Sequence, residues 1–391
     1  MTVWDSLVGQ ERAVAALRSA AAGHGMSHAW LFSGPPGSGR SNAAVAFAAA
    51  LQCEAGETGH PGAEAGCGHC LACRTSLAGT HADVTLVRTE KLSIGVDEVR
   101  ELVRRSALSP VGSRWQVLVV EDADRLTDQA CNALLKAIEE PGARTVWMLC
   151  TPTVEDVLPT IRSRCRQVVL ATPSPEAVAA FLVATDGVGE ALAAYAARAS
   201  QGHIGRARAL ARDEATRNRR REIVGYPAGL TSLGACMRAA TNLAEAAKEE
   251  ADAITAELDA REKTDLDSAY GVEARGRRPR EYGPALAALE KAQKTRAKRR
   301  VLDVVDRGLM DLSSVYRDAV ALHLGAPGAL VNEEIRGDVV ELARHTSPEL
   351  NLRRIGWIFE AREQMLEFNV PVALALESMM VALKAPQGSS R

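Results

Sequence analysis

The sequence of 391 residues predicts two fold classes in succession, a doubly wound parallel α/β sheet and then an all-helical part. Three observations support this prediction. Short apolar runs alternate with helical patterns as far as about residue 170, which is typical of a parallel sheet covered on both faces. A glycine-rich loop joins the first of these runs to a helix. Beyond Pro173-Ser174-Pro175, nearly every stretch has helical spacing.

Length and composition describe an ordinary globular chain. A chain of 391 residues is long enough for two or three domains. Hydrophobic residues make up 47% and charged residues 25%, and a net charge of −2 gives no global signal for nucleic acid, although local patches remain open. The first five residues lack the pattern of a secretory signal, and no apolar run approaches the roughly 18 residues needed to span a bilayer. We therefore expect a cytoplasmic location without membrane partners.

The elements of the α/β part follow from local apolar periodicity. Strands are expected where apolar residues run together, and helices where they recur at helical spacing. In chain order, the expected elements are a helix over 8–20, a strand over 28–32, a helix over 42–51, a strand over 83–88, a helix over 96–107, a strand over 117–120, a helix over 127–140, a strand over 146–150, a helix over 157–164 and a strand over 167–170.

The helical part begins after the proline pair. Residues 176–212 are expected to form helices with a break at Gly202 and Gly205. Amphipathic helices are expected over 243–258 and 301–324.

A basic segment of about 274–300 lies between these two stretches. It has two interpretations. The first is contact with nucleic-acid phosphates, and the second is a structural role as a solvated face or a mobile connector between helices. The second is favoured, because Tyr282 is the single aromatic residue in the run and stacking side chains usually accompany such binding.

The loop Gly34-Pro35-Pro36-Gly37-Ser38-Gly39-Arg40-Ser41 resembles the phosphate-binding pattern G-x-x-x-x-G-K-[ST]. Glycines let successive backbone N–H groups turn toward a phosphate, and the following helix N-terminus adds positive potential. Arg40 stands where the pattern has lysine, and its wide, planar guanidinium differs from a compact ammonium. The loop can attract an anion, but its fitness for hydrolysis is reduced.

Acidic residues follow the strand over 117–120 at once. They are Glu121, Asp122 and Asp124. Carboxylates at the carboxyl end of a buried parallel strand, near a phosphate loop, are where the Mg²⁺ of a nucleotide is usually held.

Four cysteines suggest a metal site. Cys53 follows a predicted helix, and Cys67, Cys70 and Cys73 follow in a C-x2-C-x2-C cluster rich in glycine. Four thiolates suit tetrahedral zinc with every position filled, which is a structural site without chemistry of its own. The alternatives are four unrelated reduced cysteines, or His69 in place of one thiolate. We expect one Zn²⁺ on the four cysteines.

Several motifs together resemble the clamp-loader branch of the AAA+ ATPases, densely over residues 1–212 and weakly beyond. Besides the loop and the cysteines, they are Val8-Gly9-Gln10, the run from Glu121 to Leu126, the string from Asn132 to Pro141, and Ser163-Arg164-Cys165. The resemblance implies an AAA+ domain over 1–172 with a zinc module at about 53–73, a helical lid over 173–212 and a helical collar over 213–391. It also implies a five-subunit ring with gamma/tau and delta subunits, which opens the beta sliding clamp and closes it on primed DNA.

The resemblance also assigns nucleotide-site residues. In the motor subunits, a loop lysine binds ATP, a strand-end Asp-Glu pair binds Mg²⁺, a strand-end threonine senses the γ-phosphate, and a lid arginine reads the nucleotide. Here Thr151 matches the sensor threonine. Glu121 replaces the aspartate that binds Mg²⁺, and Gly205 replaces the lid arginine. These changes argue against efficient phosphoryl transfer, which depends on positioning and charge. The implied, degenerate ATP/Mg²⁺ site consists of Gly34, Gly37, Gly39, Arg40, Ser41, Asp122 and Thr151.

Arg164 matches the family position whose guanidinium enters the ATP site of a neighbouring subunit. The alternative is a helix-end arginine that pairs with a local carboxylate.

Two candidate functions of the whole chain follow from these residues. The chain is expected to be a structural subunit of the DNA polymerase III clamp loader that donates Arg164 as an arginine finger and has little or no ATPase activity of its own. The alternative is an active gamma/tau-type ATPase motor.

Overall fold

The computed structural model describes residues 2–57, 65–89, 93–112, 114–272 and 279–384. The chain divides into two compact units, Met1–Arg212 and Asp213–Arg391, which are treated separately below. In the described residues, no helix combines the length and apolar character needed to cross a membrane. The finer expected boundaries, between sheet domain and lid and around the basic insertion, stay predictions.

Unit 1 is built on a parallel sheet in the strand order β2-β3-β4-β1-β5. Every residue of β1, β3 and β4 is buried, so their continuous apolar runs follow from burial on both faces. The register places Leu31 of β1 beside Leu149 of β4, and Trp147 of β4 beside Leu118 of β3. The predicted parallel sheet is confirmed. The strands are β1 (Ala29–Ser33), β2 (Val84–Val87), β3 (Gln116–Val120), β4 (Thr145–Thr151) and β5 (Arg166–Val169).

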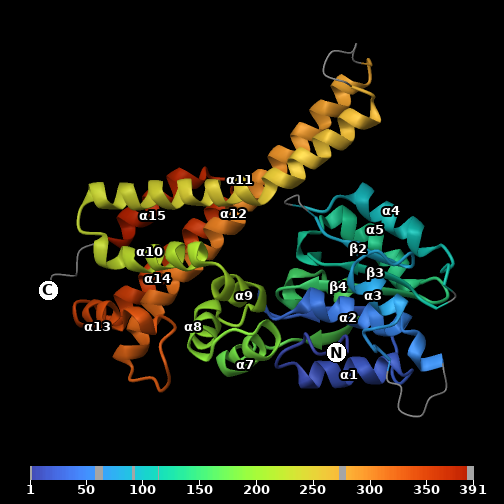
Figure 1. The fold of residues 1–391 in the computed structure, drawn as a ribbon, viewed down its shortest axis with the longest axis horizontal. Coiled ribbons are helices and arrows are strands. Elements are labelled where there is room, and N and C mark those ends of the chain that lie inside the picture. The colour runs from blue at the N-terminus through green and yellow to red at the C-terminus, as the bar shows by residue number, and fades with distance from the viewer. Residues whose placement is uncertain (1, 58–64, 90–92, 113, 273–278, 385–391) are drawn as a thin grey trace. The chain divides into compact units, whose positions relative to one another are not determined.

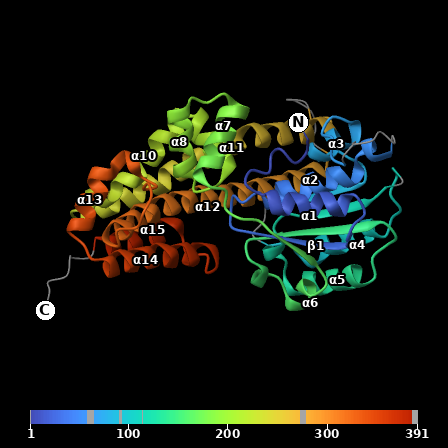
Figure 2. The same cartoon turned by 90° about the horizontal axis from the view of Figure 1, so that it is seen from below.

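Helices cover both faces of this sheet. One core lies between the sheet and the first two helices and includes Phe32 and Phe47. The other lies on the opposite face and includes Leu118 and Leu134. Figure 2 shows α1 and α2 on one side of the sheet and α5 and α6 on the other. These elements are α1 (Glu11–Ala21), α2 (Arg40–Gln52), η1 (Glu54–Glu57), α3 (Leu71–Leu77), α4 (Val96–Ser106), η2 (Ala123–Arg125), α5 (Asp128–Glu139), η3 (Val154–Asp156) and α6 (Pro159–Arg162).

Two expected helices are shorter in the structure than the sequence indicated. The first begins at Glu11 and not at residue 8, because Gly9 has a φ of +69° that helical residues do not adopt. The stretch over 157–164 contains only the four-residue α6, which begins at Pro159. Proline fixes its own φ and disfavours helical geometry in the residue before it, so the helix starts there.

Three short helices complete unit 1. Ser174 caps the first of them by accepting a hydrogen bond from the Ala177 N–H, with Pro175 at the first helical position. They share a small core that includes Leu182 and Leu210. The expected break occurs at Gly202, whereas Gly205 lies inside the last helix. The helices are α7 (Pro175–Asp186), α8 (Glu190–Ser200) and α9 (Ile204–Arg212).

The described residues of unit 2 form helices joined by loops, and no strand is found among them (Figure 1). Its main core gathers apolar residues from α11, α12, α14 and α15. The stretches expected over 243–258 and 301–324 are parts of two much longer helices, and residues 282–300 of the basic segment belong to the second and are not a connector. Residues 273–278 lie outside the described residues. The elements are α10 (Glu214–Gly229), α11 (Leu233–Ala269), α12 (Tyr282–His323), η4 (Glu333–Ile335), α13 (Arg336–Arg344), α14 (Pro348–Leu366) and α15 (Val372–Leu383).

Candidate nucleotide, metal and interface sites

The glycine loop joins β1 to α2, as the sequence predicts. Gly37 and Gly39 both have a φ of +88°, in the left-handed region that favours glycine. At Gly34, an added Cβ would come within 2.5 Å of the Leu170 carbonyl oxygen and 2.7 Å of the Ser38 hydroxyl oxygen. The three glycines are therefore required by the backbone path of the loop itself.

Arg40, the first residue of α2, turns back onto the loop. Its Nη1 donates a hydrogen bond to the carbonyl oxygen of Gly34. Burial lowers the pKa of the Arg40 guanidinium, while the nearby carboxylates of Asp124 and Asp122 act in the opposite direction. The cation at the lysine position is thus engaged by its own loop and by carboxylates of this chain.

Glu121, at the expected Mg²⁺ position, is held in an ion pair. Its Oε1 lies 2.8 Å from the Nε of Arg88, and its own side chain is only 15% exposed. Arg88 directly follows β2, and Glu121 directly follows β3, which is the neighbouring parallel strand. A carboxylate paired in this way has less charge to offer a cation, since the guanidinium already neutralises it.

Asp122 and Asp124 are the remaining carboxylates after β3. Asp122 lies 4.0 Å from Arg125, a long contact between partly exposed side chains. Burial raises the pKa of Asp124, and the like charge of Asp122 adds to this shift while Arg40 opposes it. Asp122 and Asp124 are therefore close enough to Arg40 to interact with it electrostatically.

Thr151 ends β4 and is completely buried. Its hydroxyl donates to the carbonyl oxygen of Thr153 over 2.8 Å. The neighbouring Cys150 is buried as well, and burial raises the pKa of its thiol, while a hydrogen bond with the Ser41 side chain acts in the other direction. The structure thus gathers the predicted nucleotide-site residues at the carboxyl edge of β1, β3 and β4.

Two residues without a predicted role also contact this loop. Gln10 is buried, and its amide donates to the carbonyl oxygens of Ala171 (2.7 Å) and Ser38 (3.3 Å), while its carbonyl oxygen accepts from the Ala171 N–H. His203 lies against Gly37, where an added Cβ would come within 2.5 Å of the His203 Cβ. The sequence motif Val8-Gly9-Gln10 indicates that Gln10 is important, whereas the contact of His203 with the loop could not be inferred without the fold.

The four predicted zinc ligands lie together. The Sγ atoms of Cys53, Cys67, Cys70 and Cys73 are all within 4.8 Å of one another. Three of these sulfurs accept a hydrogen bond from a backbone N–H group, each over 3.4 Å. The N–H of Cys67 donates to Cys53, that of Cys70 to Cys67, and that of Cys73 to Cys70. Four thiols at this spacing fit a tetrahedral zinc ion, because Zn–S bonds of about 2.3 Å place the sulfurs roughly 3.8 Å apart.

Electrostatics and packing prepare this cluster for a cation. Burial opposes ionisation of Cys53, but N–H groups of Cys67 and two neighbours donate to its sulfur and lower its pKa to about 7. Burial raises the pKa of Cys73, and a thiolate at Cys53 adds to this shift. The loop is fastened to the N-terminal segment, since the Val3 N–H donates to Gly66 and the Trp4 indole donates to Ala65. His69 points to the Cys67 carbonyl oxygen and is outside the cluster.

Arg164 lies just beyond α6 at the surface of unit 1, with 41% of its side chain exposed. Its Nη2 is 2.6 Å from Oε1 of Glu139, and its Nη1 donates to the Thr160 carbonyl oxygen over 2.9 Å. The guanidinium is therefore fixed within this chain by the last residue of α5 and by α6. It remains accessible to an anion approaching from outside.

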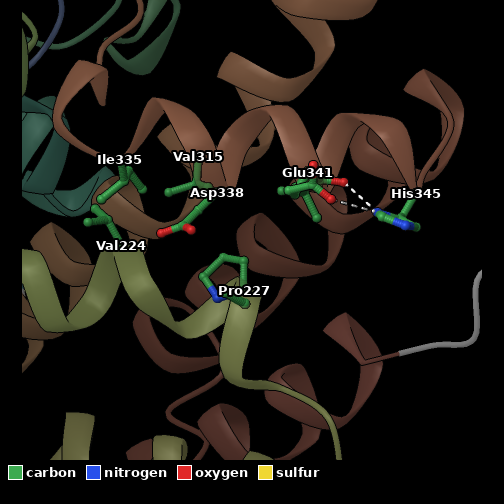
Figure 3. Close-up of a pocket in the computed structure, with 9 residues that line it drawn as sticks. Val224, Pro227, Val315, Ile335, Asp338, Glu341 and His345 are labelled. Carbon is green, nitrogen blue, oxygen red and sulfur yellow. Dashed lines mark hydrogen bonds and ion pairs between the residues drawn. The ribbon is translucent and has the colours of Figure 1, made fainter.

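A separate pocket lies in unit 2, between α10, α12 and α13 (Figure 3). It has a cavity volume of about 310 Å³ and is lined by Val224, Val315 and Asp338 among others. Nδ1 of His345 is 2.8 Å from the carbonyl oxygen of Glu341. None of the predicted site residues lines this pocket, so it does not contribute to the nucleotide, metal or Arg164 sites.

A parallel α/β unit with a glycine loop between β1 and α2 defines the class of P-loop proteins. Within this class, residues 9–174 match the family described as "DNA polymerase III, delta subunit". Over these residues the chain is similar to that family, and the match extends over less than half of its length. The match covers the sheet and its flanking helices. It ends before the three short helices α7, α8 and α9, and before unit 2.

Individual relatives agree with this family. The chain is 37% identical over 185 residues to the DNA polymerase III subunit delta' of Escherichia coli, covering 47% of this chain and 54% of the relative. It is 38% identical to delta' of Pseudomonas aeruginosa, covering 40% and 46%. It is 37% identical to the DNA polymerase III subunit gamma/tau of Mycobacterium tuberculosis, covering 45% and 30%. This chain thus spans from about a third to about half of these relatives.

Solved structures resemble the chain only weakly. A DNA polymerase III gamma subunit-related protein of Thermotoga maritima has a TM-score of 0.44 and 15% identity, covering 96% of this chain and 99% of that one. RuvB of Thermotoga maritima has a TM-score of 0.37 and 17% identity, covering 56% and 64%. Scores this low do not support an argument about function.

Proposed function

We propose that this chain is a structural subunit of the DNA polymerase III clamp loader, of the delta-prime type. In this role it helps a ring of subunits to load the beta sliding clamp onto primed DNA in the cytoplasm. It hydrolyses little or no ATP itself and gives Arg164 to the ATP site of its neighbour. The AAA+ domain, the helical lid and the helical collar supply the ring architecture.

The observation that carries this proposal is the state of the nucleotide site. Arg40 is hydrogen-bonded to Gly34 of its own loop, and Glu121 is ion-paired with Arg88. A P-loop ATPase needs both positions for the nucleotide, the cation to reach the outer phosphates and the carboxylate to hold Mg²⁺. Here each is engaged by a partner from the same chain, so ATP must displace two existing interactions to bind productively.

The interface role rests on the surroundings of Arg164. A guanidinium supplied in trans stabilises the charge that develops on the transferred phosphoryl group. Glu139 and the Thr160 carbonyl oxygen restrict the orientation of Arg164 while 41% of its side chain stays exposed. A neighbour's phosphate would replace the ion pair with Glu139, which costs little because exposed pairs of this kind contribute only about 0–1 kcal/mol.

Zinc has a structural role in this proposal. The four cysteines form a closed ligand set without an open position for a substrate. Bound zinc would cross-link the end of α2, the loop that contains Cys67 and the start of α3. The gamma/tau and delta subunits are the proposed partners in a hetero-pentamer, with helices of unit 2 as the contact region.

A second candidate function is an active gamma/tau-type motor. Specific observations favour it, namely the intact glycine loop with Ser41, the strand-end Thr151 and the presence of a carboxylate, Asp122, directly after Glu121. The 37% identity to a gamma/tau subunit over 45% of this chain is consistent with either function.

ATP hydrolysis by the isolated chain distinguishes the two functions. We expect turnover far below the rate of about 1 per second that a working enzyme reaches. The Arg40→Ala variant is the control, because it removes the loop cation and should leave any residual background unchanged. Turnover of about 1 per second or more that Arg40→Ala abolishes would reject the structural role and favour the motor.

A further inference from the structure

The outer halves of α11 and α12 form an arm, defined here as residues 252–272 and 279–300. The main core of unit 2 extends along α11 only as far as Ala247 and along α12 only from about Leu302. Figure 1 shows the two helices running side by side beyond the other helices of this unit. The arm is therefore not needed to bury the core of unit 2, and its surface is open to another role.

Polar contacts hold the two helices of the arm together. Arg296 is 5% exposed and forms ion pairs with Asp259 (3.1 Å) and Glu262. At the outer end, the hydroxyl of Tyr282 donates to Asp267 over 2.6 Å. These contacts show which side of α12 faces α11, and they account for one cation of the basic segment as an internal structural group.

The side of α12 that faces away from α11 is positively charged. A helix turns by about 100° per residue, which places Lys291, Lys294 and Lys298 within a sector of about 60°, on the side opposite to Tyr282 and Arg296. All three lysines are exposed. Along the described part of the chain none of them forms an ion pair, and Lys298 donates one hydrogen bond to Asn369 over 3.1 Å.

The surroundings of these lysines allow a charged partner to come close. Ala287 and Pro284, about one and two turns before Lys291, lie on the same side and are small and exposed. The carboxylates concentrate on α11 of the arm, on the other side of the ribbon. They are Asp252, Glu257, Asp259, Glu262, Asp265 and Asp267. The arm thus has a basic outer side on α12 and an acidic helix behind it.

We propose that Lys291, Lys294 and Lys298 bind the phosphate backbone of double-stranded DNA. The choice of DNA as the partner rests on the proposed clamp-loader function. The three lysines span about 10 Å along the helix, a length over which each strand of a duplex presents roughly three phosphates. The geometry therefore favours DNA contact over the solvated face or mobile connector that the sequence alone favoured.

Duplex DNA is favoured over a single strand because the basic side offers no stacking platform. Proteins that bind single strands without sequence preference stack bases on aromatic side chains. The arm's two described tyrosines, Tyr270 and Tyr282, pack edge to face on each other with ring centroids 5.9 Å apart. Binding through lysines alone reads no bases, so it should be independent of sequence and sensitive to salt.

The test measures binding of the full chain to a fluorescent duplex of about 20 base pairs by anisotropy, at several salt concentrations. The variant combines Lys291→Gln, Lys294→Gln and Lys298→Gln. The matched control combines Lys248→Gln, Arg261→Gln and Lys263→Gln, which removes the same charge from exposed positions of α11. We expect the variant to bind on the order of tenfold more weakly, with a salt slope smaller by about 3, and the control to bind as the unaltered chain does.

A further variant tests whether a negative charge near these lysines weakens DNA binding. Glu290 is four residues before Lys294 on α12, and Glu290→Gln should strengthen binding at low salt. Equal affinity and salt slope for the lysine variant and the unaltered chain would overturn the inference, as would an equal loss in the control or tighter binding to a single strand. Binding of an acidic protein through these lysines, with no DNA binding, would overturn it too. Arg164-dependent ATP hydrolysis in the complex is unaffected by these outcomes, so it tests the proposed function independently.

Discussion

Arg164→Ala in the assembled complex is expected to lower ATP hydrolysis at the site that Arg164 serves by about 10³-fold or more, because trans arginines contribute on that scale. Assembly should be unaffected. The substitution removes one exposed ion pair, to Glu139, and such pairs contribute about 0–1 kcal/mol to stability. Steady-state ATP turnover and copurification of the subunits measure the two effects separately.

Arg162→Ala is the matched control for Arg164→Ala. Arg162 is the last residue of α6 and is two residues earlier, so its side chain leaves the helix in another direction. The control complex should hydrolyse ATP at the unaltered rate. Unchanged turnover in Arg164→Ala, or an equal loss in both variants, would contradict the trans role and leave Arg164 as a local structural cation.

Cys70→Ser is expected to release the zinc and to destabilise unit 1. Loss of one thiolate from a four-cysteine site removes most of the binding energy, and we expect a cost on the order of 4 kcal/mol and a fall in Tm of about 10 °C. Cys70 also caps α3, since its sulfur accepts from the Cys73 N–H. Serine is a good N-cap, so the loss measured in this variant reports the metal and not the cap.

Metal content and thermal unfolding test this expectation together. Cys165→Ser is the control, because Cys165 is half-buried as Cys70 is but lies outside the cluster. The unaltered chain and Cys165→Ser should contain about one zinc per chain and Cys70→Ser close to none. An unaltered purified chain without zinc, or a Cys70→Ser variant with unchanged Tm, would reject the structural metal site.

Much of the fold follows from local sequence patterns. The central strands β1, β3 and β4 are mostly apolar and are buried along their whole length, so the apolar runs located them within one residue at each end. The length of α12 was not predictable in the same way. Residues 282–300 contain Gly283 and Pro284 near their start, which disfavour a helix interior, and end in a basic run, and contacts with α11 such as Arg296 with Glu262 support their helical state.

The candidate sites were predictable to different degrees. The cysteine spacing located the cluster of four sulfurs, and the glycine motif located the loop between β1 and α2. The partners that neutralise the nucleotide site were missed, because Arg88 and Glu121 are distant in sequence and meet only once β2 lies beside β3. A correct strand order would have placed them side by side, since both directly follow neighbouring parallel strands. The contact of Arg164 with Glu139 required the packing of α5 against α6.

The most direct test of the central claim is a titration of a purified gamma/tau-type ATPase with this chain while ATP turnover is measured. The claim is that catalysis takes place across an interface and not in this chain's own loop. It predicts that turnover rises until the two proteins are stoichiometric, that Arg40→Ala raises it equally well, and that Arg164→Ala does not. A rise that depends on Arg40 and is indifferent to Arg164 would contradict the claim.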